Sequence, residues 1–283
     1  MEASGYAAAL ADITGAPVYL IPHFNNQEPN ILFENGIMKV ITKDGIIPIK
    51  AAIRYVTQKP WNRIPIETST FIYNSTLACL SGGRNKLLAS KAYDIFNSEL
   101  IEHGLSINTP ETIRDVNKVE IPIWVNRFGG YAVVKDPYSN AGQGVYTITS
   151  EAELQAFMDL EHDYDQFIVQ SLIGHYEWSS LNEKGRLYHV GTMPSKKGEI
   201  YVADLRMMIY STPDGFAPCA IYARRAKKPL SSTILDGDSS WDMLGTNLSI
   251  KEGENTWSSD TKRLIQMDSK DFNGPVNIGS EEM

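Results

Sequence analysis

A lysine followed by a loop of small residues is the first feature of the sequence that could do chemistry. Lys135 ends an apolar segment, and Gly142, Gln143 and Gly144 lie in the loop that leads into the next apolar segment. Small residues let backbone N–H groups close on an anionic oxygen, and a nearby lysine neutralises its charge. This pattern predicts phosphate binding, and an ordinary hairpin loop is the alternative interpretation.

Two other phosphate-binding motifs are excluded by spacing. The segment Gly82–Lys86 does not fit the P-loop pattern G-x-x-x-x-G-K-[ST]. Gly142 and Gly144 lead into a strand-like segment instead of a helix, so they do not form a dinucleotide-binding fingerprint.

Charged residues within apolar segments form a second candidate site. Asp204 and Arg206 are two residues apart on a predicted strand, so both side chains point to the same face. Because an unpaired buried charge is costly, either a structural ion pair or a site that faces a bound nucleotide explains them. Arg224 and Arg225 are neighbours on the next predicted strand, so only one of them can share the face of the site. The sequence leaves open which one does.

Short strands and helices in mixed order must position these residues, and they predict an α+β protein. Apolar runs predict strands at residues 16–22, 36–42, 45–49, 130–135, 145–148, 167–170, 199–209 and 216–223. Helical periodicity covers residues 87–105 and stops at Gly104, and Ser150 caps a further helix. Thr109–Glu111 predicts the start of another helix.

Taken in chain order, these segments resemble the ATP-grasp superfamily, and within it the glutathione synthetase-like and RimK-like ligases. Lys86 at a helix start and Lys135 resemble the two nucleotide-binding lysines of the family. Gly142–Gly144 resembles the flexible loop that closes over the phosphates. The segment 168–173 resembles the hinge whose backbone contacts adenine, and it includes Gln170, Ser171 and Leu172.

The downstream part of the resemblance is the family order D-x-R, R and N-L. Asp204 and Arg206 supply the first element, Arg224 and Arg225 the second, and Asn247 with Leu248 the third. In all, the resemblance covers residues 74–250. It implies catalytic roles for Asp204, Arg206 and Arg225 and substrate binding by Arg224 and Asn247.

The resemblance also implies an overall organisation and an activity. It implies two α/β lobes that clamp ATP, at residues 84–175 and 176–265, after a smaller mixed α/β domain at 1–83 and before a polar tail at 266–283. The implied enzyme uses ATP and Mg²⁺ to join a small-molecule carboxylate to an amine or thiol through an acylphosphate, and it releases ADP and phosphate. The implied partners are therefore small molecules.

One departure from the family pattern concerns the metal. The family places magnesium ligands in a Glu-x-Asn element after N-L, and no such element follows Asn247, where the nearest match is Glu252–Asn255. The metal ligands therefore stay unassigned. Two alternatives follow, a non-catalytic or truncated ATP-binding module and an ATP-grasp phosphotransferase.

Composition limits the remaining function classes. The 283 residues carry a formal net charge of −8, which argues against a nucleic-acid partner, because such binding needs a basic face. The N-terminus lacks a signal-peptide pattern and no apolar run is long enough to span a membrane, so we expect a cytoplasmic protein. Cys79 and Cys219 are expected to be buried free thiols, and the oligomeric state is left open.

Overall fold

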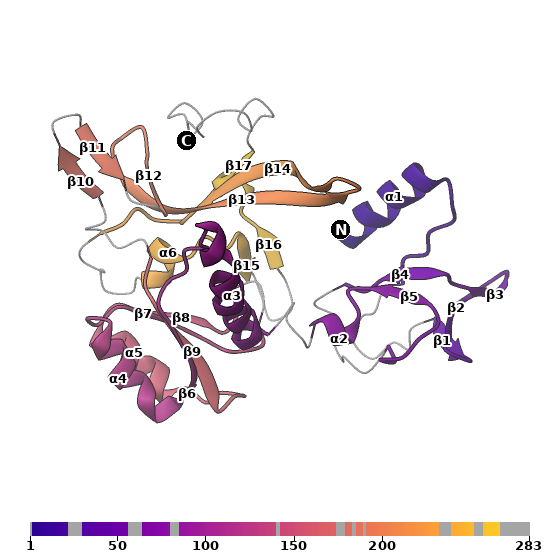
Figure 1. Ribbon diagram of the computed structural model, residues 1–283, viewed down its shortest axis with the longest axis horizontal. Coiled ribbons are helices and arrows are strands. Elements are labelled where there is room, and N and C mark those ends of the chain that lie inside the picture. The colour runs from indigo at the N-terminus through magenta and orange to yellow at the C-terminus, as the bar shows by residue number, and fades with distance from the viewer. Residues whose placement is uncertain are drawn as a thin grey trace. The chain divides into compact units, whose positions relative to one another are not determined.

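The computed structural model describes most of the chain (Figure 1). The described residues are 2–21, 30–55, 64–79, 85–139, 142–173, 179–182, 185–188, 191–231, 239–251 and 257–266. Clustering of contacts divides the chain into two compact units, Met1–Ala89 (unit 1) and Ser90–Met283 (unit 2). The expected boundaries at residues 83, 175 and 265 stay predictions.

Unit 1 combines a helix with two small sheets. These elements are α1 (Glu2–Thr14), the antiparallel strands β1 (Ile31–Glu34), β2 (Ile37–Thr42) and β3 (Gly45–Pro48), the parallel strands β4 (Ala51–Ile53) and β5 (Phe71–Tyr73), and α2 (Thr76–Ala78). Asn35 and Gly36 both have positive φ, which suits the tight turn between β1 and β2. The two predicted strands around Lys43–Gly45 are confirmed as β2 and β3.

Two predicted elements are wrong. Residues 15–21 form no strand, and Tyr19 and Leu20 are exposed, because no neighbouring strand pairs with this segment in the described part of the chain. Thr109–Glu111 does not start a helix. The residues that follow form β6 (Thr112–Asn117), whose β-branched side chains favour a strand and which pairs with a neighbour in unit 2.

The first half of unit 2 is a four-stranded antiparallel sheet. Its order is β6, β9 (Gln166–Ser171), β7 (Ala132–Lys135) and β8 (Val145–Ile148). The helices α4 (Ile121–Arg127) and α5 (Glu151–Asp159) lie together beside this sheet (Figure 1). One face of the sheet and both helices share a core made of Val116, Ile121, Val125, Ala132, Val134, Ile148, Leu154, Phe157, Phe167 and Val169. The alternate residues of β7, including Lys135, therefore point to the other face.

The second half of unit 2 is built on a long hairpin. Its sheet has the order β12 (Thr192–Pro194), β13 (Ile200–Thr212), β14 (Gly215–Arg225) and β17 (Leu264–Gln266). The core of this part contains Ile200, Val202, Ala226, Leu230 and Met243, the last from α6 (Ser240–Leu244). The strands predicted at 199–209 and 216–223 are thus confirmed and are longer than expected.

The remaining elements are the helix α3 and several short strands and turns. The helix α3 (Lys86–Leu100) starts at the end of unit 1 and continues into unit 2, and Gly104 with φ 69° follows its last turn as predicted. The other elements are β10 (Ser179–Asn182), β11 (Gly185–Tyr188), β15 (Ser249–Lys251), β16 (Trp257–Ser259) and the 3₁₀ turns Ile101–His103, Lys118–Glu120 and Thr261–Arg263. No helix in the described ranges is both long and apolar enough to cross a membrane.

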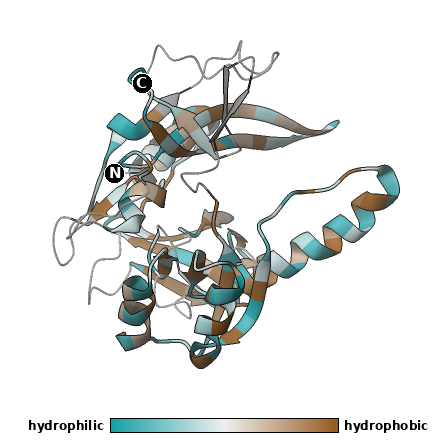
Figure 2. Ribbon diagram, turned by 90° about the vertical axis from the view of Figure 1, so that its left-hand side faces the viewer, coloured by the Kyte–Doolittle hydropathy of each residue, from teal (hydrophilic) through white to brown (hydrophobic). Residues whose placement is uncertain are grey.

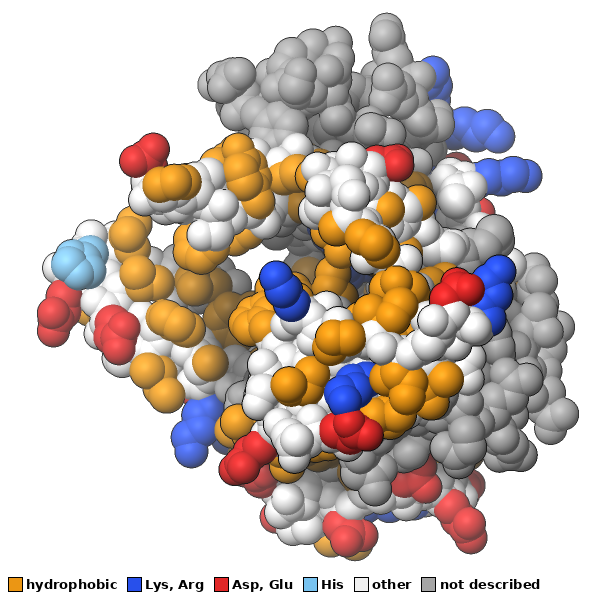
Figure 3. Space-filling model, turned by 90° about the vertical axis from the view of Figure 1, so that its right-hand side faces the viewer, with side chains coloured by type: hydrophobic (Ala, Val, Ile, Leu, Met, Phe, Trp, Pro, Cys, Tyr) orange, Lys and Arg blue, Asp and Glu red, His pale blue; other side chains and the backbone are white. Residues whose placement is uncertain are grey.

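Apolar side chains also lie at the surface. In Figure 2 brown, hydrophobic bands run along the long hairpin, and Leu205, Met207, Ile209 and Phe216 of β13 and β14 are exposed. The face drawn in Figure 3 shows hydrophobic side chains at the surface among charged ones. Cys79 is buried as expected, whereas Cys219 is exposed, so the prediction for Cys219 is wrong. Cys219 lies on the hairpin, in a run of β14 where most side chains are exposed.

Candidate functional site

Lys135 lies on the face of the first sheet that the α4 and α5 core leaves open. Its Nζ donates a hydrogen bond to Oε1 of Gln170 on the neighbouring strand β9. Nε2 of Gln170 in turn donates to Oγ1 of Thr112 on β6, at 2.7 Å. Burial lowers the pKa of Lys135, because the charged amine has lost much of its water. Lys135 and Gln170, which the sequence predicts as separate nucleotide-binding residues, are therefore hydrogen-bonded to each other on neighbouring strands.

The glycine-containing loop between β7 and β8 lies against residues from the second half of unit 2. Gly142 has φ 79° and Gly144 has φ 58°, conformations that favour glycine. A Cβ atom added to Gly142 would lie 3.0 Å from the Trp241 ring and 3.2 Å from Nδ2 of Asn247. Gln143, between the two glycines, is exposed. The loop and Asn247, predicted to act on phosphate and on substrate, are thus adjacent.

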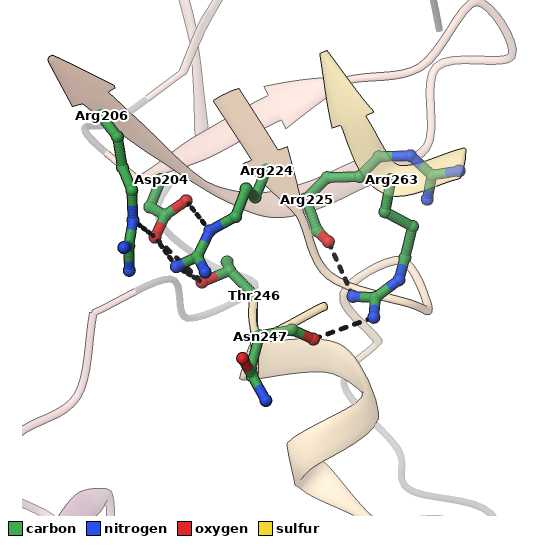
Figure 4. A network of polar contacts seen from close by, with 7 residues as sticks. All are labelled: Asp204, Arg206, Arg224, Arg225, Thr246, Asn247 and Arg263. Carbon is green, nitrogen blue, oxygen red and sulfur yellow. Dashed lines mark hydrogen bonds and ion pairs between the residues drawn. The ribbon is translucent and has the colours of Figure 1, made fainter. Parts of the chain in front are cut away.

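A network of charges occupies one face of β13 and β14 (Figure 4). Arg224 lies directly opposite Asp204 in the strand register, and its Nε donates to Oδ1 of Asp204 at 2.9 Å while its Nη2 donates to Oδ2. Nε of Arg206 lies 3.4 Å from Oδ2 of Asp204, and Oγ1 of Thr246 donates to the same oxygen at 3.2 Å. The Arg206 side chain is 50% exposed and that of Arg224 is 13% exposed, so Arg206 is the more accessible cation.

The electrostatics of this network favour the ionised carboxylate. Burial raises the pKa of Asp204, but the hydrogen bond and charge of Arg224 act against it, together with Arg206 and Thr246. The net result is a pKa of Asp204 below its ordinary value, so the carboxylate is negative at neutral pH.

Arg225 lies on the opposite face of the same sheet. Its guanidinium stands over the Tyr201 ring, 4.5 Å from the ring centre, and it extends away from Asp204 in Figure 4. This arrangement answers the question that the sequence left open, since Arg224 shares the face of Asp204 and Arg206 and Arg225 does not. The catalytic role expected for Arg225 stays a prediction.

Arg263 is a buried residue that the sequence analysis missed. Its Nη1 donates to the Arg225 carbonyl at 3.0 Å and its Nη2 to the Asn247 carbonyl at 2.9 Å, while Nε pairs with Asp260 at 2.8 Å. Arg263 thereby holds the backbone of Asn247 beside the end of β14 (Figure 4). The only signal in the sequence is the i, i+3 spacing of Asp260 and Arg263, which is common on protein surfaces.

Glu153 is a second missed residue, and it joins the two halves of unit 2. Its Oε2 accepts hydrogen bonds from the backbone N–H and the hydroxyl of Thr149, at 2.9 and 2.8 Å. Its Oε1 accepts from the backbone N–H of Ser240 at 3.1 Å, at the start of α6. The Ser240 hydroxyl is fully buried and bonds to the Thr147 hydroxyl on β8. Glu153 therefore anchors the helix that carries Trp241.

The remaining predicted nucleotide contacts lie on two elements. Leu172 is buried at the end of β9, and the N–H of Ser171 donates to the Glu111 carbonyl at 2.9 Å. Lys86 starts α3, where the Asn85 side chain caps the helix by accepting from the N–H groups of Leu87 and Leu88 at 3.0 and 3.3 Å. Lys86 belongs to unit 1, whereas all the other predicted site residues belong to unit 2.

Acidic and histidine side chains are dispersed over the described part of the chain. In the described ranges, no three His, Cys, Asp or Glu side chains gather closely enough to hold a metal ion. Asp260 follows N-L but pairs with Arg263, which lowers the pKa of Asp260 by hydrogen bonding. Glu252, Glu254 and Asn255, the nearest match to the family element, lie outside the described residues. The described residues therefore assign no ligands to Mg²⁺.

Comparison with known proteins finds matches among solved structures only. No family model matches the sequence, and no curated protein matches it. Among solved structures, the chain matches a RimK domain protein ATP-grasp from Sphaerobacter thermophilus with 15% identity and a TM-score of 0.35, over 61% of this chain and 71% of that one. It also matches the D-alanine-D-alanine ligase from Helicobacter pylori with 12% identity and a TM-score of 0.39, over 76% of this chain and 58% of that one.

The structural similarity of the chain to both of these proteins is low. The chain spans less than two thirds of the length of the D-alanine-D-alanine ligase.

Proposed function

We propose that the protein is an ATP-dependent ligase that joins a small-molecule carboxylate to an amine or thiol. The observation that carries this proposal is the contact of the Gly142 loop with Asn247, beside α6 and the end of β14. A loop that contains glycines and follows a strand ending in a lysine, as this loop follows Lys135, is suited to phosphate binding. A neighbouring face with Asp204, Arg206 and Arg224 is suited to anionic substrates.

The proposed reaction has two steps. A carboxylate oxygen attacks the γ-phosphorus of ATP, the bond from that phosphorus to the bridging oxygen breaks, and ADP leaves. The amine nitrogen or thiol sulfur of the second substrate then attacks the acyl carbon. The carbon–oxygen bond to phosphate breaks, and the nucleophile loses a proton to solvent or to a nearby base.

Each candidate residue of unit 2 would have a separate role in this reaction. Lys135 would neutralise phosphate charge, and its lowered pKa is the expected property of an amine placed in a poorly hydrated site. Arg206 and Arg224 would stabilise negative charge on the transferred phosphoryl group. The Gly142–Gly144 loop would exclude water, which protects the acylphosphate from hydrolysis. Asp204 would fix the orientation of both arginines, as its contacts with them indicate.

Magnesium stays a proposal without assigned ligands. A magnesium ion bound with ATP would supply charge neutralisation at the phosphates. A non-catalytic ATP-binding module is the second candidate function, and the observation that favours it is the lack of an acidic cluster in the described residues. A phosphotransferase would use the same nucleotide site and differs only in its acceptor.

An ADP-release assay tests the proposal. We expect the protein with Mg-ATP to release ADP only when a suitable pool of amino acids and small organic acids is present. Lys135→Ala should weaken ATP binding, whereas Lys197→Ala, which changes an exposed turn lysine of the same unit, should not. ATP binding without ADP release in any pool would favour the non-catalytic module. Unchanged ATP affinity in Lys135→Ala would reject both candidates.

A further inference from the structure

Arg54 is a buried arginine at the end of a parallel strand in unit 1. It directly follows β4, and its backbone N–H extends the β4–β5 pairing by donating to the Tyr73 carbonyl at 3.0 Å. The residue is only 3% exposed. Arginines are rarely buried to this degree unless their charge is paired. The position of Arg54 therefore calls for a partner.

The guanidinium of Arg54 has one partner where it needs several. Its Nε donates to the Asn74 carbonyl at 2.9 Å. Nη1 and Nη2 are buried and have no hydrogen-bond partner among the described residues. A guanidinium carries five N–H donors and stays charged at any ordinary pH, so it cannot avoid the cost of burial by losing its proton. The four N–H donors on Nη1 and Nη2 therefore have no acceptor among the described residues, and the positive charge of the guanidinium is uncompensated there.

The Asn74 carbonyl that accepts from Arg54 lies in a turn with several local contacts. Asn74, whose carbonyl holds Nε, has a left-handed backbone with φ 57°, and the Cys79 thiol lies 4.0 Å from the same carbonyl. Ser75 then caps α2 by accepting from the Ala78 N–H at 3.3 Å. With Nε engaged in this way, the edge formed by Nη1 and Nη2 remains. That edge matches the two oxygens of a carboxylate or phosphate in a bidentate arrangement.

Unit 1 also contains a cavity, and Arg54 is not among the residues that line it. The cavity of about 340 Å³ is lined by residues of the 64–72 segment together with Ser75 and Thr76, which directly follow Asn74 in the chain. This volume lies at the lower end of the range of small-molecule sites.

We infer that Arg54 anchors an oxyanion-binding site in unit 1, which takes the carboxylate or phosphate group of a small ligand through Nη1 and Nη2. The site does not depend on the proposed ligase function, since it lies in unit 1 and is defined by unsatisfied donors of that unit. The ligand would supply the negative charge that the described chain does not place beside Arg54.

A thermal-unfolding titration of the full chain tests this inference. The probes are succinate, a dicarboxylate, and inorganic phosphate, each compared with sodium chloride at equal ionic strength. We expect one probe to raise the Tm increasingly, and roughly with the logarithm of its concentration once that exceeds the Kd, and the probe that does so identifies the group. Lys50→Met, which removes an exposed charge from unit 1, should keep the full Tm rise.

Two variants at Arg54 sharpen the test. Arg54→Met should abolish the Tm rise and should leave the Tm without added anion equal to or above that of the wild type, because an uncompensated charge has been removed. Arg54→Lys keeps the charge but loses the bidentate edge, so the probe should bind about tenfold or more weakly. No Tm rise with either probe, or a rise that persists in Arg54→Met, would overturn the inference. A marked loss of Tm in Arg54→Met without added anion would also overturn it, since that result assigns Arg54 a partner within the chain.

Discussion

The pairing of Asp204 with Arg224 gives a prediction that can be worked through quantitatively. Two unit charges about 4 Å apart attract by about 4 kcal/mol at an effective dielectric constant of about 20. Desolvation and side-chain ordering offset part of this attraction. The Asp204 side chain is 32% exposed and that of Arg224 13%, so the pair lies between the surface and buried extremes. Hydrogen bonds to charged groups contribute about 1.5–3 kcal/mol net, and we expect a coupling energy of about 2 kcal/mol.

A double-mutant cycle measures this coupling. The variants are Asp204→Asn, Arg224→Met and the double variant, unfolded in urea and followed by tryptophan fluorescence. Fluorescence reports mainly on unit 2, because four of the five tryptophans follow residue 90. The matched control is the pair of Lys227 and Asp242, which are 3.5 Å apart with side chains 60% and 28% exposed. Its coupling should be about 0.5 kcal/mol or less, as for other exposed pairs.

The pH dependence provides an independent check. The pKa of Asp204 is below its ordinary value in the folded protein, and unfolding restores that value. The stabilisation is therefore complete above the ordinary aspartate pKa and is lost as the pH falls through the lower, folded-state pKa. In Asp204→Asn this acid-side loss should be absent. A coupling no larger than that of the control pair, at neutral pH and low salt, would refute the reasoning.

Three further predictions concern other parts of the molecule. Burial lowers the pKa of Lys135, so the free energy of unfolding should rise with pH from that lowered pKa up to the ordinary lysine value, and Lys135→Met should lack this rise in urea titrations at alkaline pH. Gly142→Ala should destabilise by about 1–2 kcal/mol for its positive φ plus a further amount for the crowded Cβ. Gly198→Ala has a similar φ and open space around it, so equal losses for the two variants would contradict the close packing of the loop. In the native protein a thiol reagent followed by mass spectrometry should modify Cys219 quickly and Cys79 slowly, and similar rates at both would contradict the assigned burial.

The parts of the fold that the sequence predicts are those with strong local signals. The hairpin around Lys43–Gly45 and the helix capped by Ser150 have turn and cap residues that act within a few positions. The strand predicted at 16–22 is wrong for the described residues 16–21, because an apolar run indicates burial but does not indicate a partner strand. The helix start predicted at Thr109–Glu111 is wrong because the residues that follow pair with a strand distant in the sequence, β6 with β9, and this pairing outweighs the local preference.

The same division holds for the candidate site. The two-residue spacing of Asp204 and Arg206 predicted a shared face, and the structure places them in contact. The choice between Arg224 and Arg225 depends on the register between β13 and β14, which no local pattern encodes. Arg263 donates to the backbone carbonyls of Arg225 and Asn247, which are distant in the sequence and lie beside Arg263 only in the folded chain. Neither the residue type of Arg263 nor its spacing in the sequence predicts these contacts.

The anchoring of α6 by Glu153 has a consequence for how a ligand could enter. Because Glu153 bonds to Thr149 and to Ser240, the helix that carries Trp241 is tied to the first sheet through groups with little contact with water. The two halves of unit 2 cannot part at this point without breaking those bonds. If ATP binds under the Gly142 loop as proposed, entry by movement of that loop would leave these bonds intact, whereas opening of a hinge at this point would break them.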